Sequence, residues 1–258
     1  MAIKQIMQMV RPKTHGVDLD DPNLTVSRKS ILQKKNFLRS IYMDWYQTLT
    51  HFIPEGNGAV VELGSGAGFL DESYPTLIQS DILWIPSIDL VMDGRALPFA
   101  KESVKAIVMT NVLHHIPDAC AFFNGAKDCL VPGGVIAMVE PWNSAWSGWI
   151  YRNLHHEPFF PESPTWEFQT SGPLSGANGA LPWILFERDR EQFFQMFPQF
   201  QLKYLNPVMP LRYLMSGGFS TRELAPGWSY PAWRLVERLF WPIKRHFNMF
   251  AEIIIQRK

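Results

Sequence analysis

The stretch Val60-Val61-Glu62-Leu63-Gly64-Ser65-Gly66-Ala67-Gly68-Phe69 decides the fold of this chain. It begins as an apolar run, passes through a carboxylate and opens into three glycines at alternating positions. A short apolar run is typical of a buried strand, and glycine is the usual residue where a tight turn strains the backbone. The pattern indicates a strand that enters a turn holding a nucleotide-containing cofactor. A tight turn that binds nothing is the alternative.

The glycine spacing separates the possible cofactors. The dinucleotide fingerprint G-x-G-x-x-G places its third glycine where this chain has Phe69, and here that glycine comes one position early, at Gly68. No Lys-Ser or Lys-Thr pair follows, as a phosphate-binding P-loop would require. The spacing therefore disfavours a pyrophosphate site and favours a cofactor without phosphate, such as S-adenosylmethionine (SAM).

Four motifs in sequence order resemble those of the class I SAM-dependent methyltransferases. Glu62-x-Gly64-x-Gly66-x-Gly68 resembles motif I, and the run from Asp93 to Phe99 resembles the adenine-binding segment. The run from Ala106 to Ile116 resembles the fourth strand with its double-histidine exit, and the run from Leu130 to Gly134 resembles the turn into the fifth strand. Over about residues 59–142 the chain is similar to the small-molecule, type 11 branch, which includes quinone-biosynthesis enzymes.

The resemblance implies an α/β fold with a Rossmann-like, doubly wound sheet of seven strands, mostly parallel with an antiparallel last strand. Continuous apolar runs suit strands that are covered on both faces. They predict strands at residues 59–63, 77–80, 88–92, 104–110, 135–140, 200–206 and 248–256. Helices are expected at residues 27–52 (one helix or two), 70–74, 117–129 and 187–197, and residues 1–24 are expected to be turn-rich.

We expect one domain overall. Its parts are an N-terminal helical segment (1–55), a SAM-binding core (56–140), a cap insertion (141–186), a core helix and strand (187–206), a second cap insertion (207–247) and the closing strand (248–258). Both insertions follow strand ends where an open α/β sheet binds its ligand. Eight of the ten tryptophans lie at or beyond Trp142, which favours an aromatic cap over an apolar or ring-bearing substrate. A small second core is the alternative interpretation.

The resemblance also implies which residues bind the cofactor. These are Glu62, Gly64, Ser65, Gly66, Gly68, Phe69, Asp81, Asp93, Gly94, Asn111 and Val112. Asp81 would bond the ribose and Asp93 the adenine amino group. The segment between Asp81 and Ile88 is shorter than a helical crossover needs, so we expect the usual second helix to be missing. That weakens the assignment of Asp81 and leaves Asp89 as a rival.

Three residues are candidates for proton transfer or substrate contact: His115, Glu140 and His156. His115 follows the fourth strand at the ligand edge, where an imidazole titrates near neutral pH. We expect at least one of His114 and His115 to position the loop instead. His156 belongs to the run His155-His156-Glu157; adjacent histidines on an extended segment point opposite ways. No metal site is therefore expected.

Composition limits the partners. Lys plus Arg and Asp plus Glu both total 24, so the net charge is zero, which argues against a nucleic-acid binder. The two cysteines, Cys120 and Cys129, are too far apart on one predicted helix to pair, which suits a reducing cytoplasm. Residues 230–250 combine apolar and cationic side chains, as an interfacial helix does, and peripheral membrane contact would favour a lipid-linked acceptor. Packing onto the domain explains the pattern equally well.

The sequence thus predicts a cytoplasmic SAM-dependent methyltransferase that acts on a small-molecule or lipid-linked acceptor at oxygen or carbon. No Asn-Pro-Pro-Tyr or Asp-Pro-Pro-Tyr run stands near the fourth strand, so methylation of an exocyclic amine is disfavoured. A noncatalytic SAM-binding scaffold or regulatory protein is the first alternative. An NAD-dependent oxidoreductase is a distant second, because Phe69 replaces its third glycine.

Overall fold

The computed structural model describes residues 21–155, 157–239 and 241–258. The strands are β1 (Ala59–Leu63), β2 (Leu77–Asp81), β3 (Leu90–Val91), β4 (Val104–Thr110), β5 (Leu130–Pro141), β6 (Phe200–Val208) and β7 (Phe250–Arg257). The α-helices are α2 (Pro22–Lys34), α3 (Asn36–His51), α4 (Ala119–Cys129), α5 (Ala145–Leu154), α6 (Leu181–Trp183), α7 (Arg190–Met196), α8 (Arg212–Ser216), α9 (Tyr230–Arg238) and α10 (Lys244–Phe247). Short 3-10 helices are η1 (Leu70–Glu72), η2 (Leu113–His115), η4 (Gly227–Ser229) and η5 (Trp241–Ile243), and η3 (Ile184–Arg188) is a π-helical turn.

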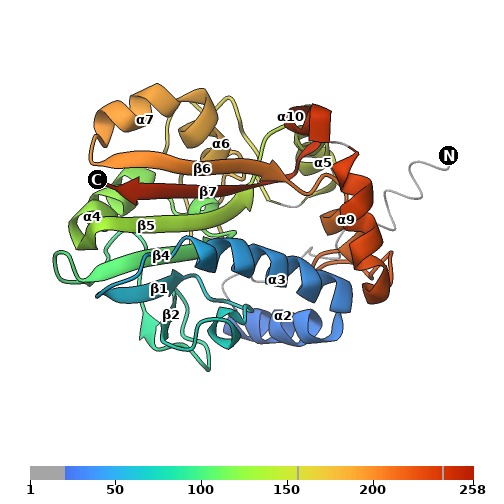
Figure 1. Ribbon diagram of the computed structural model, residues 1–258, viewed down its shortest axis with the longest axis horizontal. Helices are drawn as coiled ribbons and strands as arrows, with labels where there is room; N and C mark the ends of the chain where they lie inside the picture. The colour runs from blue at the N-terminus through green and yellow to red at the C-terminus, as the bar shows by residue number, and fades with distance from the viewer. Residues whose placement is uncertain (1–20, 156, 240) are drawn as a thin grey trace.

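The strands form one seven-stranded sheet in the order β3-β2-β1-β4-β5-β7-β6 (Figure 1). β1 to β5 are parallel, and β7 runs antiparallel to both β5 and β6. Leu63 pairs with Ser80 on β2 and with Met109 on β4, so the carboxyl ends of these strands meet at one edge. The expected seven-stranded sheet with an antiparallel last strand is confirmed.

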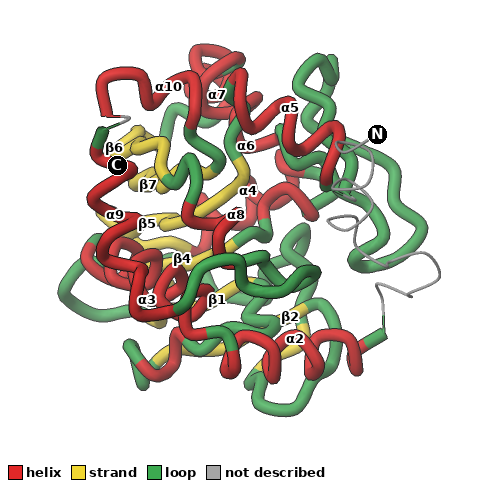
Figure 2. The backbone as a smooth tube through the Cα atoms, turned by 90° about the vertical axis from the view of Figure 1, so that its right-hand side faces the viewer, coloured by secondary structure: helices red, strands yellow, loops and turns green. Residues whose placement is uncertain are grey.

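Helices cover both faces of the sheet, as a doubly wound fold requires. α3 lies across one face, and α4 and α6 lie on the other (Figure 2). α3 buries an apolar stripe at helical spacing, including Phe37, Ile41, Trp45 and Leu49. Burial of that stripe fixes the N-terminal helices on the core.

The structure differs from the expected elements in several places. Residues 22–24, which we expected to be turn-rich, form the start of α2, because the Asp21 side chain accepts the Asn23 N–H and Pro22 suits the first helical turn. The predicted strand at 88–92 shortens to Leu90–Val91, and the predicted helix at 187–197 is divided between η3 and α7. The chain between β2 and β3 contains no helix, as its length predicts. Residues 1–20 lie outside the described residues.

Both insertions reach the carboxyl edge of the sheet. α5 follows β5 and α9 follows β6, and Figure 1 shows both at the end where the parallel strands terminate. β7 begins at the same edge, where Phe250 pairs with Pro141 and Val208. Among the described helices, none has the length and apolar character needed to span a membrane.

Candidate functional site

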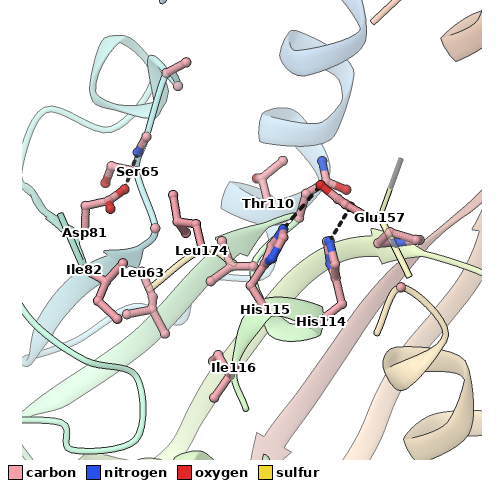
Figure 3. A pocket seen from close by; sticks show the side chains of 18 of the residues that line it. Leu63, Ser65, Asp81, Ile82, Thr110, His114, His115, Ile116, Glu157 and Leu174 are labelled. Carbon is pink, nitrogen blue, oxygen red and sulfur yellow. Dashed lines mark hydrogen bonds and ion pairs between the residues drawn. The ribbon is translucent and has the colours of Figure 1, made fainter. Parts of the chain in front are cut away.

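A cavity opens at the carboxyl edge of the sheet, between the turn after β1 and the two insertions (Figure 3). Ser65 and Asp81 lie on one side of it, and His114, His115 and Glu157 lie on the other. Its walls come from α3, from the ends of β1, β2 and β4, and from both insertions. Segments that are far apart in the sequence therefore share one ligand-sized space.

The turn after β1 depends on glycine for close packing. Gly64 has φ +70°, and a Cβ there would lie 2.5 Å from Cγ2 of Val112. Gly68 leaves room for helix α3, because a Cβ there would lie 2.7 Å from the Tyr46 hydroxyl. That hydroxyl accepts the Phe69 N–H at 3.2 Å. Gly64 therefore brings the turns after β1 and β4 together, and Gly68 brings α3 against the first turn.

Asp81 ends β2 and holds the glycine turn from below. Its Oδ2 accepts the Gly66 N–H at 3.0 Å, and its Oδ1 accepts the Leu83 N–H at 3.0 Å. Burial raises the pKa of this carboxyl above its ordinary value, against the opposing effect of these two hydrogen bonds. Asp89 instead accepts the Gln79 N–H on an exposed part of the chain and is not among the cavity residues. Of the two rivals, the structure brings only Asp81 to the cavity.

Glu62 is buried at the end of β1 and lines the cavity. Burial raises the pKa of its carboxyl to about 7, and the negative charges of Asp71 and Asp81 act in the same direction. Its Oε2 finds no hydrogen-bond donor among the described residues, and neither does the Oγ1 of Thr110, which also lines the cavity. Buried oxygens of this kind ordinarily have partners, so both positions suit a ligand with N–H groups.

Of the other residues expected at the cofactor, all but Phe69 line the cavity. Ser65, Asp93, Gly94, Asn111 and Val112 line the cavity. The Asp93 carboxylate is also ion-paired with Arg95 at 2.6 Å, which holds the pKa of that carboxyl below its ordinary value.

The expected cofactor contact of Phe69 does not fit the structure. Its side chain is buried in the core, where it packs against Tyr42 and Tyr46 and under the guanidinium of Arg39. It is absent from the cavity wall. Phe69, which replaces the third glycine of a dinucleotide turn, therefore packs against α3 and helps to hold that helix in place.

Glu140 also differs from expectation. We expected it to face a substrate, but it is fully buried beneath the turn after β4, and it does not line the cavity. Its Oε1 accepts the N–H groups of Val112 and Leu113 at 2.8 and 2.7 Å, and its Oε2 lies 2.6 Å from Nδ1 of His114. Glu140 thus positions the turn, because both of its oxygens are already occupied.

His114 and His115 both line the cavity, but their pKa values are shifted in opposite directions. Burial lowers the pKa of His114, but Glu140 and Glu157 outweigh it and raise the pKa to about 9. Burial and the neighbouring His114 lower the pKa of His115 to about 4. The Nδ1 of His115 lies 3.2 Å from the Gly176 carbonyl oxygen, so a proton there leaves a lone pair on Nε2. His156, the third candidate, lies outside the described residues.

The cap supplies tyrosine and phenylalanine to the cavity rather than tryptophan. Tyr151 and Phe159 come from the first insertion, and Tyr213 and Phe219 come from the second. No tryptophan is found among the described side chains that line the cavity. Trp142 and Trp166 are buried, whereas Trp149 and Trp228 are largely exposed. The tryptophans therefore do not form the acceptor wall, and the expectation that they would is corrected.

Two comparisons bear on this arrangement. The model of a family described as a methyltransferase domain matches residues 61–138, which include the glycine turn, Asp81, Asp93 and the double histidine. That match, the four motifs and the order of the strands all indicate the same kind of domain. Residues 61–138 therefore form a SAM-dependent methyltransferase domain.

Solved structures show the same fold for this methyltransferase. A SAM-dependent methyltransferase from Thermotoga maritima, described as a possible histamine N-methyltransferase, is 15% identical, with a TM-score of 0.50 over 84% of this chain and 89% of that one. An S-adenosylmethionine-dependent methyltransferase from Mesorhizobium loti is 14% identical, with a TM-score of 0.50 over 88% of this chain and all of that one. Comparison with curated proteins by sequence gives no match.

The cofactor of the methyltransferase is SAM, and the cavity fits it. The unpartnered Oε2 of Glu62 is an acceptor for an ammonium group, and Asp81 stands at the end of β2 beside the glycine turn. Sequence reasoning missed Tyr42 and Tyr46, which line the cavity from α3. Their spacing matches that of the buried stripe of the helix, so nothing in the pattern separates them from core residues.

Proposed function

We propose that this methyltransferase transfers a methyl group to an oxygen or carbon atom of an apolar, ring-bearing small molecule. The observation that supports it best is the single cavity that joins the glycine turn to the aromatic side chains of the cap. When bound, SAM supplies a methyl group already activated by its sulfonium. The protein then has to hold donor and acceptor in line and exclude water.

The donor side of the cavity is built from β1, β2 and the segment after β3. We propose that Glu62 and Thr110 take the amino acid part of SAM, since their buried oxygens face the cavity without a donor from the described chain. Asp81 would take the ribose, and Asp93 would take the adenine amino group at the opposite end. Each contact places a carboxylate or hydroxyl oxygen opposite an N–H or O–H group.

The acceptor side is walled by rings. Tyr151, Phe159, Tyr213 and Phe219 offer apolar area with few charges, which suits a planar or branched hydrophobic acceptor. An amine acceptor would need a carboxylate that accepts its proton. The acidic group on this side, Glu157, is already paired with His114 and His115. This arrangement favours oxygen or carbon over nitrogen as the methylated atom.

Transfer of a labelled methyl group tests the proposal. The full chain is incubated with methyl-labelled SAM and matched pairs of acceptors that differ only in the reactive group, a phenol against the corresponding aniline. We expect label on the phenol oxygen or on a ring carbon. Label confined to the aniline nitrogen would contradict the choice of acceptor atom. SAM binding without transfer to any acceptor would favour the noncatalytic scaffold.

A lipid-linked acceptor remains a second proposal, and helix α9 supports it. Tyr230 is buried and Glu237 bonds Arg212, so one side of the helix is packed on the molecule. Leu235 and Leu239 on the other side are 63% and 77% exposed. Exposed cations accompany them at Arg234 and Arg238, as in helices that lie on anionic membranes.

Sedimentation with lipid vesicles tests that second proposal. We expect the full chain to sediment with anionic vesicles and less with neutral ones, and the double variant Leu235→Ser with Leu239→Ser to stay in the supernatant. Met196→Ser, which changes an apolar residue on α7 that is 50% exposed, is the control and should behave as the wild type. Equal sedimentation of wild type and double variant would rule out α9 as the contact.

A further inference from the structure

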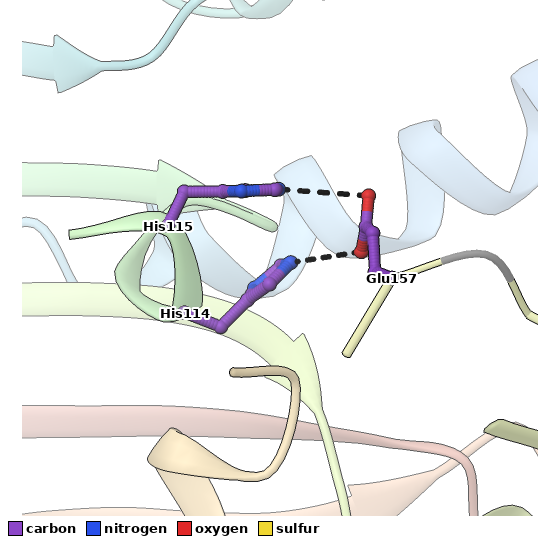
Figure 4. A group of neighbouring side chains, drawn as sticks. All are labelled: His114, His115 and Glu157. Carbon is purple, nitrogen blue, oxygen red and sulfur yellow. Dashed lines mark ion pairs between the residues drawn. The ribbon is translucent and has the colours of Figure 1, made fainter. Parts of the chain in front are cut away.

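Two imidazoles and a carboxylate converge on the acceptor side of the cavity, across from the glycine turn (Figure 4). The Nε2 of His114 lies 3.4 Å from Oε2 of Glu157, and the Nε2 of His115 lies 3.7 Å from Oε1 of the same carboxylate. One ligating atom from each residue lies within 4.8 Å of the other two. We propose that His114, His115 and Glu157 bind a divalent first-row transition ion.

The spacing of the three groups suits a shared ion better than direct hydrogen bonds. Charge-assisted hydrogen bonds between imidazole and carboxylate span about 2.7–2.9 Å, which is shorter than either contact. Two ligands at about 2.1 Å from a tetrahedral ion lie about 3.4 Å apart, close to both observed distances. Two histidines with one carboxylate form a donor set that transition ions such as zinc and iron use while leaving positions open.

The outer shell is built as metal-binding histidines require. Each imidazole has its Nδ1 against an oxygen, Glu140 Oε2 at 2.6 Å for His114 and the Gly176 carbonyl at 3.2 Å for His115. Nδ1–H donation to a carboxylate or carbonyl fixes the ring and leaves the Nε2 lone pair for the ion. Both Nε2 atoms face the same carboxylate, so two separate outer contacts orient two ligands toward one point.

The sequence pattern did not predict this site. We expected no metal, because adjacent histidines such as His155 and His156 point opposite ways on an extended segment and would need ligands from elsewhere. The ligands instead come from the turn after β4 and from the first insertion, 42 positions apart counted from His115 to Glu157. Only the fold brings them together.

The role of the ion in catalysis rests on the proposed function. A divalent ion lowers the pKa of an oxygen ligand, so an acceptor hydroxyl held there would release its proton to solvent near neutral pH. The oxygen then forms the bond to the methyl carbon as the carbon–sulfur bond breaks, and the bonding electron pair passes to sulfur. All three ligands line the cavity, where that oxygen would lie.

Cobalt titration tests the site without any acceptor. The full chain, stripped with a chelator and desalted, is titrated with Co²⁺ and then with Zn²⁺. We expect one equivalent of Co²⁺ to give visible absorption bands, and Zn²⁺ to abolish them by displacement. His115→Ala and Glu157→Gln should each weaken Co²⁺ binding by about 100-fold or more. His51→Ala removes an exposed histidine on α3 and should bind as the wild type does.

Calorimetry with SAM in the presence of chelator separates this inference from the proposed function. Retained SAM binding by a variant shows that it is folded and that the donor site is intact. Absence of stoichiometric Co²⁺ binding to the wild type would overturn the metal site while leaving the methyl-donor site standing. Unchanged Co²⁺ binding in either SAM-binding variant would also overturn it, and the cluster would then be an ion pair with protonated His114.

Discussion

Nδ1 of His114 lies 2.6 Å from Oε2 of Glu140, with both side chains almost wholly buried. The contact ties the turn after β4 to the end of β5. The same carboxylate accepts two backbone N–H groups of that turn, from Val112 and Leu113. A residue outside the cavity therefore sets the position of the two residues, Val112 and His114, that face into it.

Replacement of Glu140 by Gln should destabilise the fold. One oxygen becomes an amide NH₂ group, which then faces N–H donors in a buried space. An unsatisfied buried hydrogen-bonding group costs about 1–3 kcal/mol in free energy of unfolding. Urea unfolding measures the loss, and Glu55→Gln at an exposed position is the control. Equal unfolding midpoints for the two variants would mean that Glu140 does not hold the turn.

Gly64→Ala should destabilise the fold more than Gly133→Ala does. Both glycines have positive φ, +70° and +82°, so alanine costs about 1–2 kcal/mol of backbone strain at either. A Cβ at Gly133 meets nothing within 4 Å, whereas a Cβ at Gly64 overlaps Val112. The difference between the two melting temperatures isolates the close contact between the turns. Equal losses would show that Val112 moves aside.

Asp81→Ala should weaken SAM binding, and Asp89→Ala should not. The substitution removes the bond from Asp81 to Gly66 and the proposed contact with the ribose, which together should cost about 1–3 kcal/mol in binding free energy. Asp89 lies nearby on the chain but outside the cavity. Calorimetric affinities of the two variants check this. A larger loss for Asp89→Ala would reverse the assignment of the ribose contact.

Glu62 should make stability depend on pH. The pKa of its carboxyl is about 7 in the folded protein against 4.5 ordinarily, so the folded state holds this proton more tightly than the unfolded chain does. The stabilisation is complete below pH 4.5 and is lost as the pH rises through about 7, by up to about 3 kcal/mol. Glu62→Gln should lack this decline when unfolding is measured from pH 4.5 to 8.

Glu62 should also couple SAM binding to pH. An ammonium group at its Oε2 requires the ionised carboxylate, so protonated protein must release a proton on binding. SAM affinity should therefore rise with pH and level off above about 7. Calorimetry in buffers of different ionisation enthalpy measures the released proton. No proton release at pH 6 would place the ammonium elsewhere.

The sheet could be predicted from the sequence because each strand is encoded locally. The runs at β1, β4 and β7 are mainly apolar, and most of their residues are buried in the structure. The position of Gly64 and Asp81 at the cavity could be predicted for the same reason, because both residues directly follow or end a strand of the sheet. Local sequence pattern was therefore enough to predict the core and the side of the cavity that holds the glycine turn.

The other parts of the site could not be predicted, because their contacts join distant segments. Tyr46 reaches the glycine turn from a helix whose spacing indicates only a buried face. Glu140 stands at a strand end, where position alone suggests a ligand contact, but the turn after β4 folds over it and uses both of its oxygens. We wrongly expected Phe69 at the cofactor, because its position in the motif does not show that its ring packs against Tyr42 and Tyr46.

Titration calorimetry of the full chain with SAM, and with its demethylated product S-adenosylhomocysteine, tests the central claim most directly. The account predicts one binding site for each, competing for the same cavity, with Asp81→Ala weakening both. Failure of both compounds to bind the folded protein would contradict it.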